Sequence, residues 1–440
     1  MLARYLGSKK SILTPLLAQV GAHCAAGDHV VDAFSGSLAV SLGLKKAGYR
    51  VTANDINLFS AVLADAYLLH DEPPTAHDEV LAPHSPVAAH GVARSVVAGL
   101  DGRPGWLFLE NSEWRHRYVR LLALQAHLQV MHLADLDERD RRTDFFDTYC
   151  EQGRLSKYTS SRGSTGHRRF LSPPNAERLD LILNQLRAWR RAAVIDDHTH
   201  ALLMATVLRA VERVANTQGT YHDFPRSDWD PRALQPLTLD PPALDDCLGG
   251  VGGHRAGREA DSLDFVATAG KSRLLYLDPP YNFRQYTAYY FLPNVICRYP
   301  DMADPDEYFA QVSYVRGQNP QDDFSSTFCK PARFIEGMRT LINRAQTDTV
   351  LISYFNGRNH WSKFDSGPDD TGRRLLEELL TGPGFEPGTL VTQVVPRMNY
   401  ASYGGFRARP VDELLLSART RQTDRRDTCG GADDGLRTVA

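Results

Sequence analysis

The sequence predicts an α/β protein whose doubly wound, mostly parallel sheet is interrupted by a mainly helical insert. Residues 28–56 read as strand, glycine-containing turn, helix and strand, which is one βαβ unit. Further apolar strands appear only after residue 260, and amphipathic helices dominate the stretch between. A chain of 440 residues is long enough for this two-part organisation.

The βαβ unit begins with "HVVDAF", a short β-branched run that predicts the first strand. "SLAVSLGLKKAG" carries apolar residues at helical spacing and stops at Gly48. "YRVTANDI" predicts a second strand that ends at Asp55. In a doubly wound sheet, the carboxyl ends of such strands face the ligand cleft.

The insert contains three amphipathic segments, 114–136, 175–195 and 199–216, that predict helices. The glycine-rich stretch "GGVGGHRAG" predicts a linker that returns the chain to the sheet. Strands are then expected in "SRLLYLDPPY", "TDTVLISYFNG" and "DELLLSA", with a helix near 331–346.

These elements predict a sheet domain formed by 1–60 and 256–418, an insert at 61–255 and a tail at 419–440. The tail is polar, which predicts disorder.

The bulk composition excludes several classes of protein. The net charge is −3, so a nucleic-acid partner would need a local basic patch. The sequence lacks a run of eighteen apolar residues, which argues against a membrane span. Its six cysteines are widely spaced without a CxxC pair, which disfavours a zinc site or a disulfide framework. We therefore expect a cytoplasmic protein without a membrane partner.

The turn after the first strand is a candidate cofactor site. Gly36 would let the backbone turn tightly beside a ligand, and an acid at the position of Asp55 commonly holds ribose hydroxyls. "FSGS" lacks the G-x-G-x-x-G spacing of a pyrophosphate site, which favours a nucleoside cofactor without phosphates over NAD or FAD. A plain strand–turn–helix with a surface aspartate explains the same pattern.

The tetrapeptide "DPPY" is a candidate catalytic site at the end of a strand. Asp278 would reach the ligand cleft, and Pro279 and Pro280 lack N–H groups, so their carbonyls are free to face a ligand. Tyr281 offers a flat face for a planar base. An acid and a carbonyl acceptor beside an aromatic ring form a socket for an exocyclic amino group. The alternative is a Pro–Pro turn with a packed tyrosine.

Together with "ARYLGSKKSIL" at the N-terminus, these motifs resemble the Dam-type (DPPY-containing) adenine-specific DNA methyltransferases. The shared order is an aromatic–Gly–Lys motif, FxGxG, an acid after the next strand, an inserted recognition region and DPPY. The resemblance covers about residues 3–418. It implies a class I methyltransferase fold, with a Rossmann-like sheet and a target-recognition domain in the insert.

The resemblance also implies roles for individual residues. S-adenosylmethionine would be the methyl donor, and its cofactor-binding residues would be Tyr5, Lys9, Phe34, Gly36, Asp55, Asp261 and Asp278. The catalytic residues would be Asp278, Pro279, Pro280 and Tyr281. A metal is not expected, because a sulfonium is already a strong electrophile.

Two positions depart from the family pattern. Leu38 stands where FxGxG has its second glycine, which predicts a looser backbone approach to the cofactor. "GTYHDFPR" lacks the lysine of Gly-x-Tyr-x-x-x-Lys, and Arg226 is expected to supply the basic contact.

The insert supplies the positive charge that DNA binding needs. Residues 151–193 contain nine Lys or Arg against Glu151, Glu177 and Asp180. The loop "KYTSSRGSTGHRR" adds Tyr, Ser and Thr, which suits phosphate and base-edge contacts. The residues expected to contact DNA are Lys157, Arg162, Arg168, Arg169, Arg226 and Arg284. The alternative is a solvated helical face with a mobile loop.

We therefore interpret the sequence as a DNA methyltransferase that acts on the N6 amine of an adenine flipped out of double-stranded DNA. A role beside a cognate restriction endonuclease and an orphan or phage-borne enzyme are both compatible. The alternatives are a cytosine-N4 methyltransferase, since the same socket fits that amine, and a catalytically inactive DNA-recognition subunit.

Overall fold

The computed structural model describes residues 5–75, 86–245, 247–356, 359–361, 369–398, 410–421 and 437–438. The chain divides into two compact units. The sheet unit comprises Tyr5–Ala64, Gly249–Tyr286 and Phe324–Ala440, and the helical unit is built mainly from Asp65–Leu248 and Thr287–Asp323. The segment 287–323, which we assigned from sequence to the sheet domain, therefore clusters with the helical unit.

The sheet unit contains an eight-stranded sheet among its described residues, in the order β10-β5-β2-β1-β6-β7-β9-β8. Neighbours from β5 to β7 pair in parallel, whereas β10, β9 and β8 pair antiparallel. The strands are β1 (His29–Asp32), β2 (Arg50–Ala53), β5 (Arg255–Ala256), β6 (Ser272–Leu277), β7 (Thr347–Phe355), β8 (Val391–Met398), β9 (Pro410–Arg419) and β10 (Arg437–Thr438). The predicted mostly parallel sheet is confirmed.

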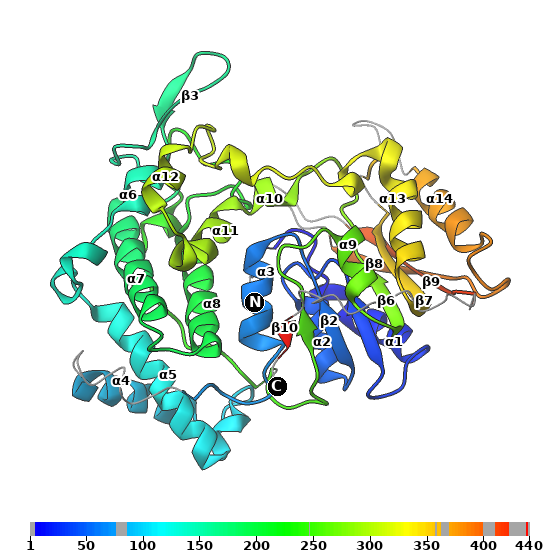
Figure 1. The fold of residues 1–440 in the computed structure, drawn as a ribbon, viewed down its shortest axis with the longest axis horizontal. Coiled ribbons are helices and arrows are strands. Elements are labelled where there is room, and N and C mark those ends of the chain that lie inside the picture. The colour runs from blue at the N-terminus through cyan, green and yellow to red at the C-terminus, as the bar shows by residue number, and fades with distance from the viewer. Residues whose placement is uncertain are drawn as a thin grey trace. The chain divides into compact units, whose positions relative to one another are not determined.

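Helices cover both faces of this sheet (Figure 1). Buried residues of α9 (Ser262–Thr268), α13 (Pro331–Arg344) and α14 (Thr371–Leu380) share one core with side chains of β1, β6, β7 and β9. The remaining helices of this unit are η1 (Lys10–Ile12), α1 (Leu13–Gly21), α2 (Ala39–Lys46) and η9 (Thr327–Cys329), and α3 (Leu58–Tyr67) begins here. Burial on both faces explains why the central strands read as continuous apolar runs.

Three strands of this sheet were not predicted. β5 lies inside the expected glycine-rich linker, and β10 lies inside the expected disordered tail. The rest of that tail beyond Arg421 is outside the described residues. β8 carries exposed side chains on an edge strand, so its hydrophobic pattern is weak. Strands of two residues show no period at all, which is why the sequence missed them.

The helical unit confirms the three predicted amphipathic helices. They are α5 (Ser112–Val130), α7 (Pro173–Arg191) and α8 (Asp197–Val214). Two prolines open the first turn of α7, where a missing N–H costs least. The unit also contains α4 (Pro86–Leu100), η3 (Leu107–Glu110), η4 (Leu133–Asp135), η5 (Glu138–Asp140), α6 (Asp144–Tyr149), η6 (Pro231–Leu234), α11 (Phe291–Arg298), η7 (Tyr299–Asp301), α12 (Pro305–Ala310) and η8 (Pro320–Asp322), and α10 (Tyr286–Tyr289) leads into it.

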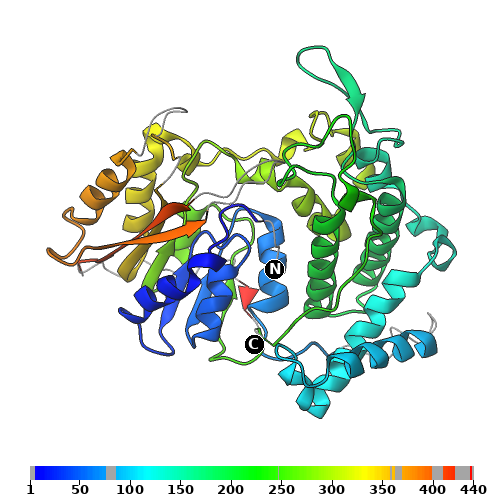
Figure 2. The ribbon, with the colours of Figure 1, turned by 180° about the vertical axis from the view of Figure 1, so that it is seen from behind.

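One hairpin stands out from these helices. It is formed by β3 (Lys157–Thr159) and β4 (Thr165–His167), which pair antiparallel. Figures 1 and 2 show it projecting from the helical unit. None of the helices in the described part of the chain is both long and apolar enough to cross a bilayer.

Candidate functional site

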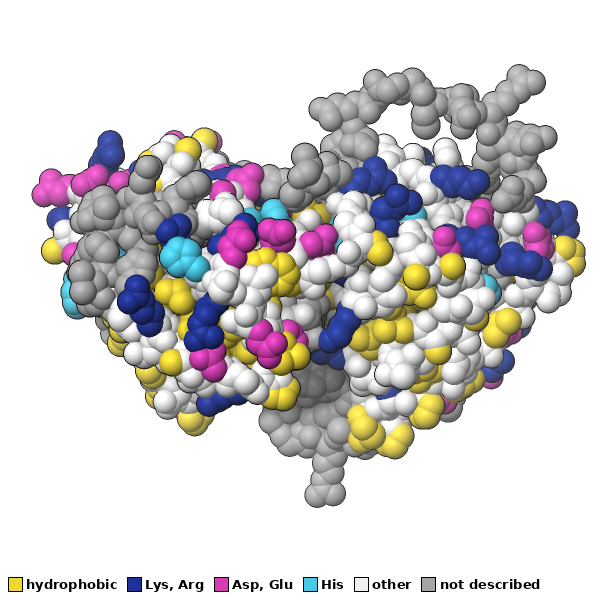
Figure 3. All heavy atoms as spheres, turned by 90° about the horizontal axis from the view of Figure 1, so that it is seen from below, with side chains coloured by type: hydrophobic (Ala, Val, Ile, Leu, Met, Phe, Trp, Pro, Cys, Tyr) yellow, Lys and Arg dark blue, Asp and Glu magenta, His cyan; other side chains and the backbone are white. Residues whose placement is uncertain are grey.

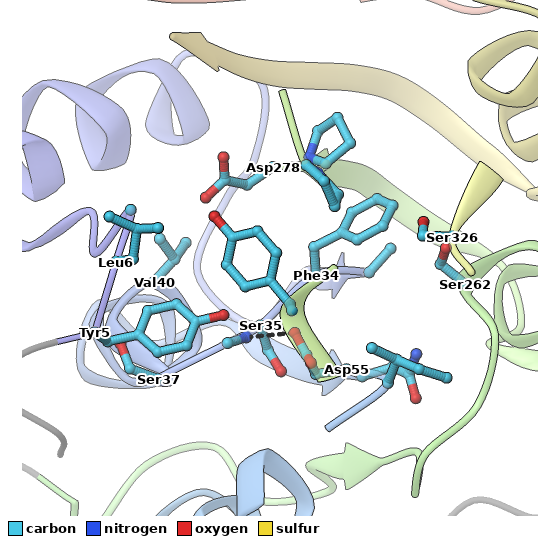
Figure 4. A pocket seen from close by; sticks show the side chains of 18 of the residues that line it. Tyr5, Leu6, Phe34, Ser35, Ser37, Val40, Asp55, Ser262, Asp278 and Ser326 are labelled. Carbon is cyan, nitrogen blue, oxygen red and sulfur yellow. Dashed lines mark hydrogen bonds between the residues drawn. The ribbon is translucent and has the colours of Figure 1, made fainter. Parts of the chain in front are cut away.

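A cavity lies at the carboxyl ends of β1, β2 and β6, within the sheet unit. It encloses about 890 Å³ of space between the protein atoms, including open solvent at its mouth. Every residue assigned from sequence to cofactor binding or catalysis lines it: Tyr5, Lys9, Phe34, Gly36, Asp55, Asp261, Asp278, Pro279, Pro280 and Tyr281. Figure 4 shows Tyr5, Phe34, Asp55 and Asp278 around this cavity.

The turn after β1 is tight and requires glycine at position 36. Gly36 has a φ of +49°, and a Cβ built there would lie 2.7 Å from the ring of Tyr5. Its N–H donates to Oδ2 of Asp55 at 2.9 Å. The turn, the N-terminal segment and the acid after β2 are therefore fixed against one another.

Asp55 is a buried carboxylate held by the protein on both oxygens. Oδ1 accepts hydrogen bonds from the backbone N–H and the side-chain amide of Asn57, both at 2.9 Å. Burial raises the pKa of Asp55, and these hydrogen bonds oppose that rise. Because a carboxylate can accept about four hydrogen bonds, the side chain retains acceptor capacity toward the cavity.

Leu38 keeps the turn geometry that a glycine would supply. Its backbone is left-handed, with a φ of 63°, and its N–H donates to the carbonyl of Ser35 at 2.7 Å. The side chain is fully buried and is absent from the residues that line the cavity. Burial of the leucine side chain offsets the cost of the left-handed conformation. The looser approach of the backbone to a cofactor stays a prediction.

Asp278 follows β6 and is paired with a lysine from the N-terminal segment. The Lys9 ammonium lies 2.9 Å from Oδ1 of Asp278 and 2.8 Å from Oε1 of Glu413. The exposed fractions of Lys9 and Glu413 are 3% and 0%. Lys9 is therefore a buried residue of the cavity wall that pairs with two carboxylates.

Burial is the largest influence on the ionisation of Asp278. It raises the pKa of this carboxyl to about 6, although the positive charge of Lys9 lowers it. Burial also raises the pKa of the Tyr281 phenol, which stays neutral. The Tyr281 ring lies 5.0 Å from the ring of Phe355 and 6.0 Å from the Lys9 ammonium, measured to the ring centres.

Asp261, which also lines the cavity, has a structural role as well. The Asp261 carboxylate accepts from the N–H of Leu263 at 2.9 Å and so caps α9. Within the described residues, no group of three or more His, Cys, Asp or Glu side chains is arranged to hold a metal ion.

The residues expected to contact DNA do not form a single group. Lys157 and Arg162 are exposed on the β3–β4 hairpin. Arg169 is largely buried, pairs with Glu151 at 2.7 Å and lies over the ring of Trp229. Arg226 pairs with Asp223 at 2.6 Å and lies 3.8 Å from the centre of the Phe224 ring.

Arg168 contradicts the expectation of a DNA contact. Its exposed fraction is 1%, and its guanidinium donates to the backbone carbonyls of Leu155, Val312 and Tyr314 at 2.8, 3.3 and 2.8 Å. A buried guanidinium that already serves the backbone cannot reach a phosphate. Arg284 belongs to the sheet unit, where it is partly exposed and follows the DPPY tetrapeptide.

Sequence reasoning missed three charged residues near the cavity. Glu413 and Arg397 are joined by an ion pair of 2.8 Å, and they extend the Lys9–Asp278 pair. Asp32 ends β1 and is fully buried. The acids Asp412 and Glu413 beside the apolar run "LLL" were a signal for Glu413, but the sequence does not show which cation would meet it.

Comparison with known proteins supports the same reading of the chain. The model of the D12 class N6 adenine-specific DNA methyltransferase family matches residues 5–79 and 129–319. These segments include the N-terminal motif, the turn after β1, Asp55 and DPPY.

Several curated proteins are similar over long segments. The type II methyltransferase M.NlaIII of Neisseria lactamica is 31% identical over 195 residues, 44% of this chain and 53% of that protein. The modification methylase StsI of Streptococcus sanguinis is 23% identical over 356 residues, 80% of this chain and 44% of that protein. The type II methyltransferase M.FokI of Planomicrobium okeanokoites is 26% identical over 414 residues, which are 93% of this chain and 51% of that protein. The chain thus spans about half the length of these relatives.

Proposed function

The chain belongs to the D12 class N6 adenine-specific DNA methyltransferase family, and on that premise we propose that it methylates the N6 amine of adenine in double-stranded DNA. The observation that carries the proposal is the shared cavity. Asp55 and Asp278, more than two hundred residues apart in sequence, line one cavity together with Gly36 and Tyr281.

The cavity has the chemistry expected of a site for S-adenosylmethionine. Asp55 and Asp261 offer carboxylate oxygens at its walls, and Phe34, Val40 and Ile56 offer apolar surface. Gly36 allows the ring of Tyr5 to pack closely against the turn, because a Cβ at this position would lie 2.7 Å from that ring. When bound, S-adenosylmethionine would supply a methyl group on a sulfonium, an electrophile with a neutral leaving group.

The DPPY segment would hold the target amine. Asp278 and the Pro279 carbonyl are two acceptors for the two amine hydrogens, and Tyr281 would stack on the flipped base. Stacking of this kind stabilises a base by roughly 1–3 kcal/mol, which offsets part of the cost of flipping. As the nitrogen lone pair is used for bonding, the amine becomes more positive, and the carboxylate stabilises that charge.

DNA recognition is proposed for the helical unit. The β3–β4 hairpin presents Lys157 and Arg162 to solvent. On the face drawn in Figure 3, basic side chains intermingle with acidic ones. Since the net charge of the chain is −3, a local contact by the hairpin fits this chain better than a broad basic surface. The names of the relatives suggest a modification role, so a cognate restriction endonuclease is a proposed partner.

Incubation with duplex DNA and labelled S-adenosylmethionine tests the proposal. Digestion to nucleosides and mass spectrometry should show N6-methyladenine. Asp278→Ala should abolish transfer, a loss of at least about 100-fold, while DNA binding persists. N4-methylcytosine in the digest would show that the target is the cytosine amine rather than the adenine amine. If the wild-type chain binds duplex DNA but transfers no methyl group, the binding-only alternative stands.

A further inference from the structure

A line of alternating charges runs through the interior of the sheet unit. Arg397 on β8 pairs with Oε2 of Glu413 on β9, and Oε1 of Glu413 pairs with Lys9. Lys9 in turn reaches Oδ1 of Asp278. The cavity lies at the Asp278 end of this line, because Asp278 and Lys9 line it and the other two residues do not.

Glu413 is also held by a hydroxyl group. The hydroxyl of Ser353 on β7 donates to Oε1 of Glu413 at 2.8 Å. Its strand register places Phe355 directly opposite Glu413, so Ser353 is the diagonal neighbour on the same face. Glu413 is fully buried, and a buried carboxylate held by a hydroxyl and two cations has one available position.

The balance of charge on Lys9 matters for Asp278. An ammonium paired with Asp278 alone would cancel most of the negative charge that the amine needs nearby. Glu413 attracts the same ammonium, so Lys9 orients one oxygen of Asp278 while its charge is divided between two carboxylates. The second oxygen of Asp278 is the one that would face the target.

We propose that Glu413 is a positioning residue for methyl transfer, which holds Lys9 so that Asp278 remains a strong acceptor for the amine. This inference rests on the proposed function. It assigns Glu413 and Arg397, which lie outside the DPPY and cofactor motifs, to the control of Asp278.

The charged and titratable groups that act on Asp278 come from several elements. They are Lys9 from the N-terminal segment, Glu413 from β9, Arg397 from β8, Tyr276 from β6, Tyr281 after β6 and Asp32 from β1. The Glu413 charge raises the pKa of Asp278, whereas the Arg397 charge lowers it. Removal of Glu413 should therefore shift the acidic limb of the pH–rate profile to lower pH, and removal of Arg397 should shift it to higher pH.

The test measures single-turnover methyl transfer from pH 5 to 9 in three variants. Glu413→Gln keeps the shape of the side chain and should lower the plateau rate by about 10–100-fold, as loss of a supporting contact does. Its acidic limb should move down by about 0.5–1 pH unit. Arg397→Gln should move that limb up. Glu378→Gln removes an exposed carboxylate paired with Arg374 and is the matched control.

A second readout does not depend on activity. Carbon NMR of ¹³C-labelled aspartate, with the Asp278 signal assigned through Asp278→Asn, should give a lower pKa in Glu413→Gln and a higher one in Arg397→Gln. Shifted pKa values in a protein that transfers no methyl group would remove the proposed function but keep the charge network. Methyl transfer with unshifted values in both variants would overturn the role of Glu413. If neither variant folds, the cluster serves the sheet, and the proposal is also overturned.

Discussion

The two units differ in where the charged residues predicted from sequence lie. In the sheet unit, the residues chosen from sequence converge on one cavity, because the carboxyl ends of β1, β2 and β6 meet there. In the helical unit, the basic residues chosen from sequence separate into exposed and buried side chains. An ordered set of motifs constrains where a residue lies in space, whereas a basic run constrains only local charge.

Burial of a charge does not by itself indicate a ligand site in either unit. Arg168 in the helical unit is 1% exposed, and Asp32 in the sheet unit is 0% exposed. Neither lines the cavity. Asp278, which does line it, has a side chain that is 17% exposed. Access to the cavity, rather than depth of burial, separates the candidate catalytic residues from the structural ones.

The sharpest test of this distinction is Arg168→Ala. Loss of the guanidinium would leave three part-buried backbone carbonyls without their donor and would remove an almost fully buried side chain. We expect a stability loss of roughly 3–5 kcal/mol. Denaturant unfolding of the variant measures this loss. Arg162→Ala, at an exposed arginine on the hairpin that precedes Arg168, is the control and should unfold like the wild type. An Arg168→Ala protein of full stability would contradict the structural role.

Asp32→Asn tests the buried charge in the sheet unit. Burial raises the pKa of Asp32 to about 7, although Ser41 donates to it at 2.6 Å. A carboxyl whose pKa is higher in the folded than in the unfolded protein makes the protein less stable as pH rises, because the unfolded chain releases the proton first. Between pH 5 and 8 the free energy of unfolding of the wild type should therefore fall by about 2–3 kcal/mol relative to that of Asp32→Asn.

Thermal unfolding at several pH values measures this difference. Asp264→Asn, at a carboxylate that is 81% exposed, is the matched control. A wild type and an Asp32→Asn variant with parallel stability profiles would show that Asp32 keeps its charge in the folded protein.

The sequence predicted the sheet and the cavity more fully than the contacts inside them. The runs "VVDAF" and "LLYL" predict central strands, because a strand that is buried on both faces has an almost continuous apolar sequence. Gly36 and Asp278 follow from strand ends. The partner of Lys9 could not be predicted, since Glu413 comes from a strand on the far side of β7 and only the folded register brings it near.

The hairpin provides the smallest and most selective prediction. Lys157→Ala with Arg162→Ala should weaken DNA binding by about 10-fold and reduce the salt slope by about 2, because each cation would neutralise one phosphate. Stability should not change, since both side chains are exposed. Arg103→Ala with Arg139→Ala removes the same charge from other exposed positions of the helical unit and is the control. An equal loss of binding in both double variants would attribute the effect to net charge rather than to the hairpin.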